Sequence, residues 1–223
     1  ALTRGKSIVD IAVIHPIESY WIQAGAVDKT QLKKDRMEKD FSNVIEWLLF
    51  SHLDFDFISE SLLPTQYKGS ENKKIFVGEM QYKAVVVPNL KTIRKSTLEV
   101  LEGFQKAGGK VIFMGELPTH IDGVEREFPD FVKTSERISF ARDALIFSLK
   151  ELQIIDIRDS DGWLASNCIY NYRQDKNCNW LFICHAQASP LEGEFMGRYN
   201  PFEPLHIKVK GEFTPIVWDT LTG

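Results

Sequence analysis

The densest group of side chains able to do chemistry lies near the N-terminus, in the segment His15–Trp21 (HPIESYW). His15 and Glu18 could bond the hydroxyl groups of a sugar, and Tyr20 and Trp21 offer flat faces on which a sugar ring can lie. The segment therefore predicts a substrate rim. The alternative is an interface, in which the aromatic side chains close the domain edge or pack against a neighbouring domain. Packing is the commoner outcome for aromatic side chains at the ends of elements.

A second candidate is the turn Phe113-Met114-Gly115-Glu116, which follows an apolar run. In enzymes with a nucleophile on such a turn, a thiol or hydroxyl is needed to attack the substrate. Glu116 and the nearby His120 could orient a nucleophile, but the turn itself has none. We therefore expect no nucleophilic catalysis at this turn.

No metal or cofactor site is predicted. The chain has five histidines, and none lies two or four residues from another, the spacing that favours metal binding. Cys168, Cys178 and Cys184 form no Cys-x-x-Cys pair, so we expect partly buried thiols in a reducing compartment. Two carboxylate pairs are present, but their spacing alone does not place them opposite each other; these are Asp54/Asp56 and Asp159/Asp161.

Apolar runs separated by helical patterns must position these groups. The alternation of strand and helix with short connections predicts a parallel sheet with helices on both faces, a three-layer doubly wound α/β fold. In such a sheet, ligands bind beyond the carboxyl ends of the strands, where both candidate segments fall. The helices are expected at about residues 30–53 and 96–107, the second opened by a capping box at Ser96–Glu99 and closed by Gly108-Gly109. The predicted strands are Ile8–His15, Asp56–Ser59, Ala84–Val87 and Lys110–Met114.

The pattern changes towards the C-terminus. We predict a helix at Ser139–Gln153, and we place a domain boundary near residue 160, with an α/β domain over 1–160. Residues 161–223 are expected to form an antiparallel β extension or the start of a β-sandwich, because the later runs alternate and carry hairpin turns. The predicted strands here are Ile154–Ile157, Cys168–Arg173, Trp180–His185, Leu205–Val209 and Ile216–Trp218.

Composition excludes some classes of partner. The 223-residue chain has a net charge of −4, whereas a nucleic-acid-binding surface needs a basic stripe. No apolar run approaches the roughly 20 residues of a membrane span. The first residues carry no secretory leader, and we expect a bacterial cytoplasmic protein whose true N-terminus lies upstream.

Four segments together resemble a known accessory domain: residues 11–21 (IAVIHPIESYW), 53–63 (LDFDFISESLL), 75–90 (IFVGEMQYKAVVVPNL) and 96–118 (STLEVLEGFQKAGGKVIFMGELP). They are similar to the class I glutamine amidotransferase-like, flavodoxin-like domain that follows the catalytic barrel in large bacterial glycoside hydrolases. The β-galactosidases with a trimerisation domain and the α-L-rhamnosidase-like enzymes are the two groups concerned. The run at residues 215–223 (PIVWDTLTG) resembles the start of their next β-sandwich, with Thr220 where those enzymes carry proline.

This resemblance implies a non-catalytic domain of a glycoside hydrolase acting on plant or host glycans, because the catalytic carboxylates of these families belong to the barrel. It makes the turn Phe113–Glu116 a vestigial nucleophile turn. It also implies the preceding barrel and the following β-sandwich as partners, with carbohydrate contact and homo-oligomerisation as further expectations and no cofactor. Two alternatives stay open: a free-standing amidotransferase-like protein without a nucleophile, and a carbohydrate-binding module.

Overall fold

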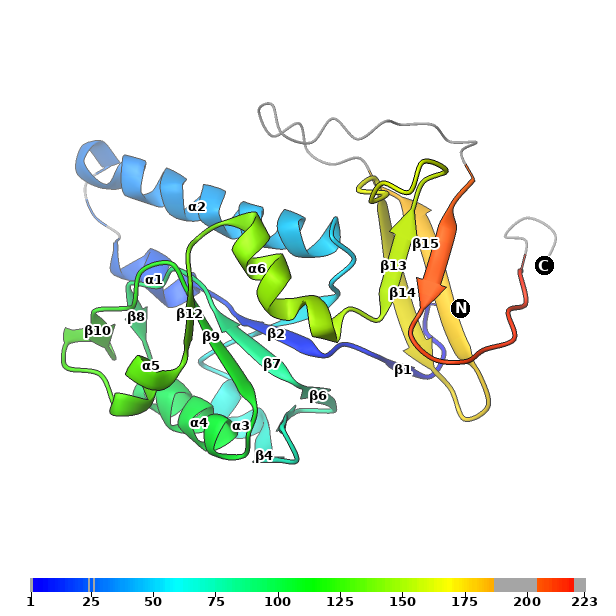
Figure 1. Ribbon diagram of the computed structural model, residues 1–223. Coiled ribbons are helices and arrows are strands. Elements are labelled where there is room, and N and C mark those ends of the chain that lie inside the picture. The colour runs from blue at the N-terminus through cyan, green and yellow to red at the C-terminus, as the bar shows by residue number, and fades with distance from the viewer. Residues whose placement is uncertain (1, 24, 26, 187–203, 219–223) are drawn as a thin grey trace.

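Five parallel strands form the central sheet, in the order β12-β9-β7-β2-β3 (Figure 1). The computed structural model describes residues 2–23, 25, 27–186 and 204–218. Numbered along the chain, the parallel strands therefore lie in the order 2-1-3-4-5 across the sheet. The four predicted strands and their parallel pairing are confirmed, and a fifth strand is added. The strands are β2 (Ile11–Ile14), β3 (Phe55–Ile58), β7 (Ala84–Val87), β9 (Lys110–Met114) and β12 (Glu136–Ile138).

The central strands are apolar along their whole length because both faces of the sheet are covered. All four side chains of β2 and all four of β7 are buried. The edge strand β12 lacks this signature, since Glu136 and Arg137 are exposed. An apolar run therefore predicts the inner strands of such a sheet but not this edge.

Helices cover each face (Figure 1). On one face, α2 (Val27–Leu49) and α6 (Arg142–Leu149) pack on side chains such as Val13 and Met114. On the other face, α4 (Lys95–Lys106) buries Leu98, Leu101 and Phe104 against the sheet. The helices expected near residues 30–53, 96–107 and 139–153 are thus present, with shifted ends.

The two ends of α4 are determined by different parts of the chain, the C-terminus by the glycines that follow it and the N-terminus by a distant carboxylate. Gly108 has φ +80°, as expected for a helix C-terminus, and a Cβ on Gly109 would lie 1.9 Å from the Phe104 ring. The predicted capping box is wrong, because the helix begins at Lys95 and no side chain caps it from within. Instead, Asp122 from a distant loop accepts a hydrogen bond from the Lys95 N–H at 3.1 Å.

Short elements surround the α/β unit. Residues 74–82 form the antiparallel hairpin β5–β6, and β4 pairs with β5 as a third strand. A second small sheet has the order β11-β10-β8. The elements are α1 (Ile17–Ile22), α3 (Leu63–Gln66), β4 (Tyr67–Glu71), β5 (Lys74–Val77), β6 (Met80–Tyr82), β8 (Thr92–Ile93), β10 (His120–Ile121), β11 (Val124–Glu125), α5 (Asp130–Thr134) and the 3-10 helix Lys150–Leu152.

Two small antiparallel sheets form a separate β unit with its own core, drawn at the right of Figure 1. In one, β15 (Asn179–His185) and β1 (Lys6–Ser7) flank β14 (Cys168–Gln174). In the other, β13 (Ile155–Arg158) pairs with β16 (His206–Val209). The start of the chain therefore joins this unit before it enters the parallel sheet.

One predicted strand in this region is wrong. Ile216–Trp218 forms no strand and its side chains are exposed, although the Trp218 ring meets the Trp180 ring edge-on at 5.3 Å. An apolar run forms a strand only where a neighbouring strand offers its backbone groups. The rest of the predicted β-sandwich opening, residues 219–223, lies outside the described residues. None of the helices in the described part of the chain is long and apolar enough to cross a membrane.

Candidate functional site

The carboxyl edge of the parallel sheet is the first place to look for a ligand site. The strand order reverses between β2 and β7, and crevices at such a switch point bind ligands in open α/β sheets. Here the crevice is closed: the cavity at this edge has a volume of only about 20 Å³, and Met37, Asp40 and Phe41 of α2 line it. A single water needs about 10–15 Å³, so this space holds no small-molecule substrate.

The polar groups at this edge bond to each other. Asn89, just after β7, donates a hydrogen bond to the Asp40 carboxylate at 3.3 Å. Burial raises the pKa of Asp40, and the hydrogen bond from Asn89 opposes that rise. This carboxylate therefore has a structural partner.

The segment His15–Trp21, expected as a loop, contains the short helix α1. Its anchor is Ser19, which sequence reasoning missed. The buried Ser19 hydroxyl donates to the Thr92 carbonyl at 2.9 Å and accepts the N–H groups of Lys91 and Thr92 at 2.9 and 3.0 Å. These bonds fasten α1 to β8. A serine inside a mostly apolar segment gives no signal of such a role.

The four predicted site residues of this segment do not converge on one cavity. Glu18 pairs with Arg94 at the start of α4, with Oε1 2.6 Å from Nη2. Tyr20 donates to Glu38 of α2 at 2.8 Å. Because α2 and α4 cover opposite faces of the sheet, these two side chains are held in different directions.

The other two differ in exposure. The half-buried ring of His15 meets Phe41 and Phe57 edge-on at 5.3 and 5.5 Å, and burial lowers its pKa. Trp21, in contrast, is 62% exposed. Of the four, Trp21 is the side chain that presents a large surface to an outside partner.

The turn Phe113–Glu116 keeps a sharp geometry. Phe113 and Met114 are buried on opposite faces of the sheet, and Gly115 has φ +82°. A Cβ on Gly115 would lie 3.3 Å from the Phe140 Cβ, so a side chain here would be both strained and crowded. Glu116 is exposed. A side chain at Gly115 would require this strained backbone conformation and a shift of a few tenths of an ångström in its neighbours.

His120, the other group considered for this turn, is occupied elsewhere. Its Nδ1 lies 2.7 Å from the Thr119 hydroxyl, which in turn accepts a hydrogen bond from Lys91 at 2.7 Å. A shallow depression of about 610 Å³ lies beside it, lined by Pro118, Thr119, Glu125, Arg126, Glu127, Phe128 and Lys133.

The N-terminus of α4 would suit an anion, because helix N-termini carry unpaired N–H groups and partial positive charge. Carboxylates of the chain itself already bind there. Glu60 accepts the Arg94 N–H at 2.8 Å, and Asp122 accepts the Lys95 N–H. Burial raises the pKa of Glu60 to about 7, while the hydrogen bond from Arg94 opposes the rise. The sequence gives no sign of this role, since Glu60 is a single acidic residue after β3.

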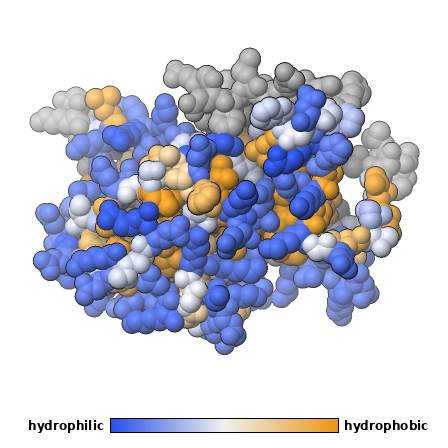
Figure 2. Space-filling view, in the orientation of Figure 1, coloured by the Kyte–Doolittle hydropathy of each residue, from blue (hydrophilic) through white to orange (hydrophobic). Residues whose placement is uncertain are grey.

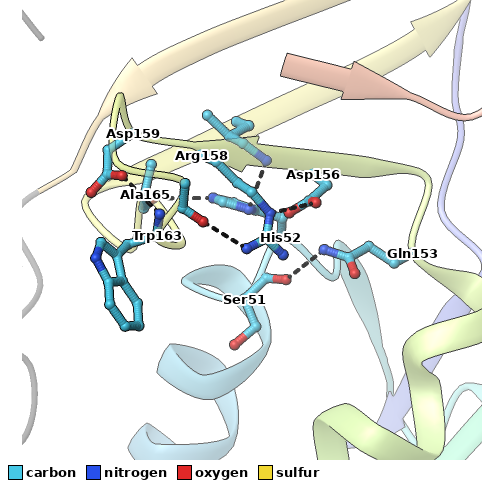
Figure 3. A network of polar contacts seen from close by, with 10 residues as sticks. Ser51, His52, Gln153, Asp156, Arg158, Asp159, Trp163 and Ala165 are labelled. Atoms are coloured by element: carbon cyan, nitrogen blue, oxygen red, sulfur yellow. Dashed lines mark hydrogen bonds and ion pairs between the residues drawn. The ribbon is translucent and has the colours of Figure 1, made fainter. Parts of the chain in front are cut away.

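A buried polar network joins the end of α2 to the β unit (Figure 3). His52 Nδ1 accepts the Ile157 N–H at 3.3 Å, so the neutral ring carries its proton on Nε2 and donates to the Ala165 carbonyl at 3.1 Å. Burial lowers the pKa of His52, in accord with this neutral form. Gln153 donates to the Ser51 carbonyl at 3.2 Å. The ring lies fully buried, with a hydrogen-bond partner at each nitrogen.

The remaining carboxylates and thiols have structural surroundings. Tyr82 donates to Asp56 at 3.0 Å, and burial raises the pKa of Asp54 to about 6. The Asp159 carboxylate accepts backbone N–H groups of its own loop. The three cysteines are free thiols. Within the described residues, no three His, Cys, Asp or Glu side chains are grouped to hold a metal ion.

Comparison with known proteins gives partial likenesses. Neither a protein-family model nor a curated protein sequence matches this chain. An exo-carrageenase from Bacteroides ovatus aligns over 78% of this chain and 22% of its own, at 17% identity and TM-score 0.49. A rhamnosidase from a Novosphingobium species aligns over 78% and 17%, at 10% identity and TM-score 0.45. A β-galactosidase from a Rahnella species aligns over 83% and 24%, at 15% identity and TM-score 0.36. This chain therefore spans about a fifth of the length of these solved proteins.

Proposed function

We propose that this chain is a non-catalytic domain of a glycoside hydrolase, with roles in domain packing, oligomerisation and the substrate rim. The proposal begins from the sequence resemblance of residues 11–118 to the amidotransferase-like domains of such enzymes. The superpositions, with TM-scores below 0.5, do not carry it. The three aligned proteins are named as a carrageenase, a rhamnosidase and a β-galactosidase, and all three names denote glycoside hydrolases.

The closed crevice between β2 and β7 is the observation that carries the non-catalytic role. An enzyme of this architecture needs room for a substrate at this switch point, whereas here α2 leaves about 20 Å³. Gly115 occupies the turn without a nucleophile, and Glu60 occupies the N-terminus of α4. These three features support a scaffold role.

We extend the proposal to the type of α/β fold. A strand order of 2-1-3-4-5 is that of flavodoxin-like sheets, and helices lie on both faces. These features support a flavodoxin-like, three-layer domain related to class I glutamine amidotransferases.

We assign Trp21 to a contact with the catalytic barrel or its substrate. Its indole is exposed while Glu18 and Ser19 bind within the chain, so the helix is fixed and leaves Trp21, together with Ile22, on the outside. His15, Glu18 and Tyr20 then support α1, as positioning residues. The barrel before this chain, a β-sandwich after it and a second copy of the enzyme are the proposed partners.

The encoding reading frame tests this proposal. We expect a polypeptide several times longer, which hydrolyses nitrophenyl galactosides or rhamnosides, whereas the 223-residue chain alone hydrolyses neither these nor glutamine. Turnover by the chain alone, abolished by Glu116→Gln or His120→Ala, would instead favour a free-standing hydrolase. A reading frame that ends near this chain would remove the parent enzyme from the proposal.

A further inference from the structure

Trp163 is exposed, as are Trp21 and Trp218, and it lies far from α1. It belongs to the loop between β13 and β14 and is 72% exposed. The loop adjoins His52, whereas α1 contacts α2 at Glu38. At 1.5 Å per residue, the distance along α2 from Glu38 to its end at Leu49 is about 16 Å. Trp21 and Trp163 therefore belong to different sites.

The loop that carries Trp163 is held by many hydrogen bonds. Asp159 Oδ1 accepts the N–H groups of Asp161 and Trp163 at 3.0 and 2.8 Å, and the Asp159 N–H donates to the Trp163 carbonyl at 2.9 Å. Arg158 donates to the Gly162 carbonyl at 2.9 Å and is itself fixed by Asp156, also at 2.9 Å. Gly162 supplies the left-handed turn, with φ +84°. The backbone of Trp163 is thus preorganised, which lowers the entropic cost of binding.

The indole of Trp163 points away from this network (Figure 3). Residues 160–162, which form the tip of the loop beside it, are exposed and polar or glycine. Phe147 of α6 offers a contrast: it is 83% exposed, and Figure 2 shows apolar side chains gathered over α6. An apolar patch suits a protein surface, whereas one flat ring among polar groups suits a ligand that is polar at its rim and apolar on its face.

We propose that Trp163 is a stacking platform for a pyranose ring of a neutral glycan. The C–H groups on one face of the sugar lie on the electron-rich face of the indole, and the sugar hydroxyls meet the polar tip of the loop. An uncharged glycan is favoured over a sulfated one, because the loop carries Asp159 and Asp161 and the chain has a net charge of −4. The choice of a sugar as the ligand rests on the proposed function.

Nuclear magnetic resonance of the ¹⁵N-labelled chain tests this site directly. The five tryptophans give separate indole N–H signals, and Trp163→Phe identifies the signal of interest. The probes are neutral galacto-oligosaccharide, methyl α-L-rhamnopyranoside and sulfated carrageenan oligosaccharide. We expect a saturable shift of the Trp163 signal with a neutral probe. Trp163→Ala should weaken binding roughly tenfold or more, a change of about 1.4 kcal/mol or more, while Phe147→Ala leaves it unchanged.

Three results would overturn the inference: no saturable shift of this signal with either neutral probe, tighter binding of the sulfated probe, or equal loss of binding in Phe147→Ala. A saturable shift confined to the Trp21 signal would place the sugar site at α1 instead. This test is independent of the test of the proposed function. The reading frame shows whether a parent glycosidase exists, whereas the titration measures sugar binding by the chain alone.

Discussion

Glu60 keeps its carboxyl group in surroundings that admit almost no water. The residue is 2% exposed, and the backbone N–H of Arg94 is its hydrogen-bond donor. Burial raises the pKa of this carboxyl to about 7, well above the ordinary glutamate value of 4.5 that applies in the unfolded chain. Between these two values the folded protein holds a proton that the unfolded protein has lost. The contribution of Glu60 to the free energy of unfolding therefore falls as pH rises from about 4.5 to 7.

We predict that Glu60→Gln raises stability at pH 8 but hardly changes it at pH 5. The glutamine resembles the protonated carboxyl and cannot ionise, so the variant escapes a cost of up to about 3 kcal/mol at high pH. Urea unfolding at both pH values measures the effect. Glu116→Gln makes the same chemical change at an exposed position and should show no such difference. Equal pH dependence in wild type and Glu60→Gln would contradict the buried-carboxyl account.

At the scale of elements, α1 shows how a short helix is held at a sheet edge. Its six residues are too few to be stable by themselves. The Ser19 hydroxyl bonds three backbone groups near β8, and the Glu18–Arg94 pair adds a contact to α4. The position of Trp21 therefore depends on polar contacts made by other residues of α1.

We predict that Ser19→Ala lowers the free energy of unfolding by about 1–3 kcal/mol, because it leaves buried backbone groups without partners. Trp21→Ala should change it by less than about 0.5 kcal/mol in this chain, since the indole is exposed. Thermal and urea unfolding of both variants provide the measurement. If Trp21→Ala costs as much as Ser19→Ala, the indole packs within the chain and not on a partner.

Variants of the proposed parent enzyme separate the two roles proposed for Trp21. A substrate rim predicts a lower kcat/KM for Trp21→Ala at unchanged melting temperature, whereas a domain seam predicts a lower melting temperature. Glu18→Gln weakens the attachment of α1 to Arg94 in either case. Wild-type activity and melting temperature in both variants would show that α1 does neither.

At the scale of the whole molecule, the α/β unit and the β unit share a buried polar seam. His52 bonds both Ile157 and Ala165, and Gln153 bonds Ser51 (Figure 3). His52 has φ +58°, an uncommon conformation for a residue with a side chain. The two hydrogen bonds of its ring offset that strain and tie the end of α2 to the β unit.

We predict that His52→Ala destabilises the chain by about 2–4 kcal/mol, since it leaves a buried N–H and a buried carbonyl unpaired and creates a cavity. His206→Ala is the matched control, because His206 is exposed on β16. Hydrogen exchange of β13 in His52→Ala should be faster than in the control. Equal stability of the two variants would show that the seam does not depend on the imidazole.

The sequence alone determined the inner parallel strands, the helices on both sheet faces and the glycine end of α4. These features follow from local patterns: buried strands read as apolar runs, helices show a 3.6-residue period, and Gly108 adopts a backbone conformation that side chains disfavour. The lack of a nucleophile at Phe113–Glu116 was also readable, because it depends on residue type.

Only the tertiary structure decided which polar groups meet. Asp122 caps α4 from 27 residues away, Glu60 reaches Arg94 across 34, and His52 bonds Ala165 across 113. The tertiary structure likewise decided that β1 pairs with β14 and that Ile216–Trp218 pairs with no strand. Local patterns report whether a residue is buried and in what backbone geometry. Hydrogen-bond partners depend on which distant segments the folded chain brings into contact.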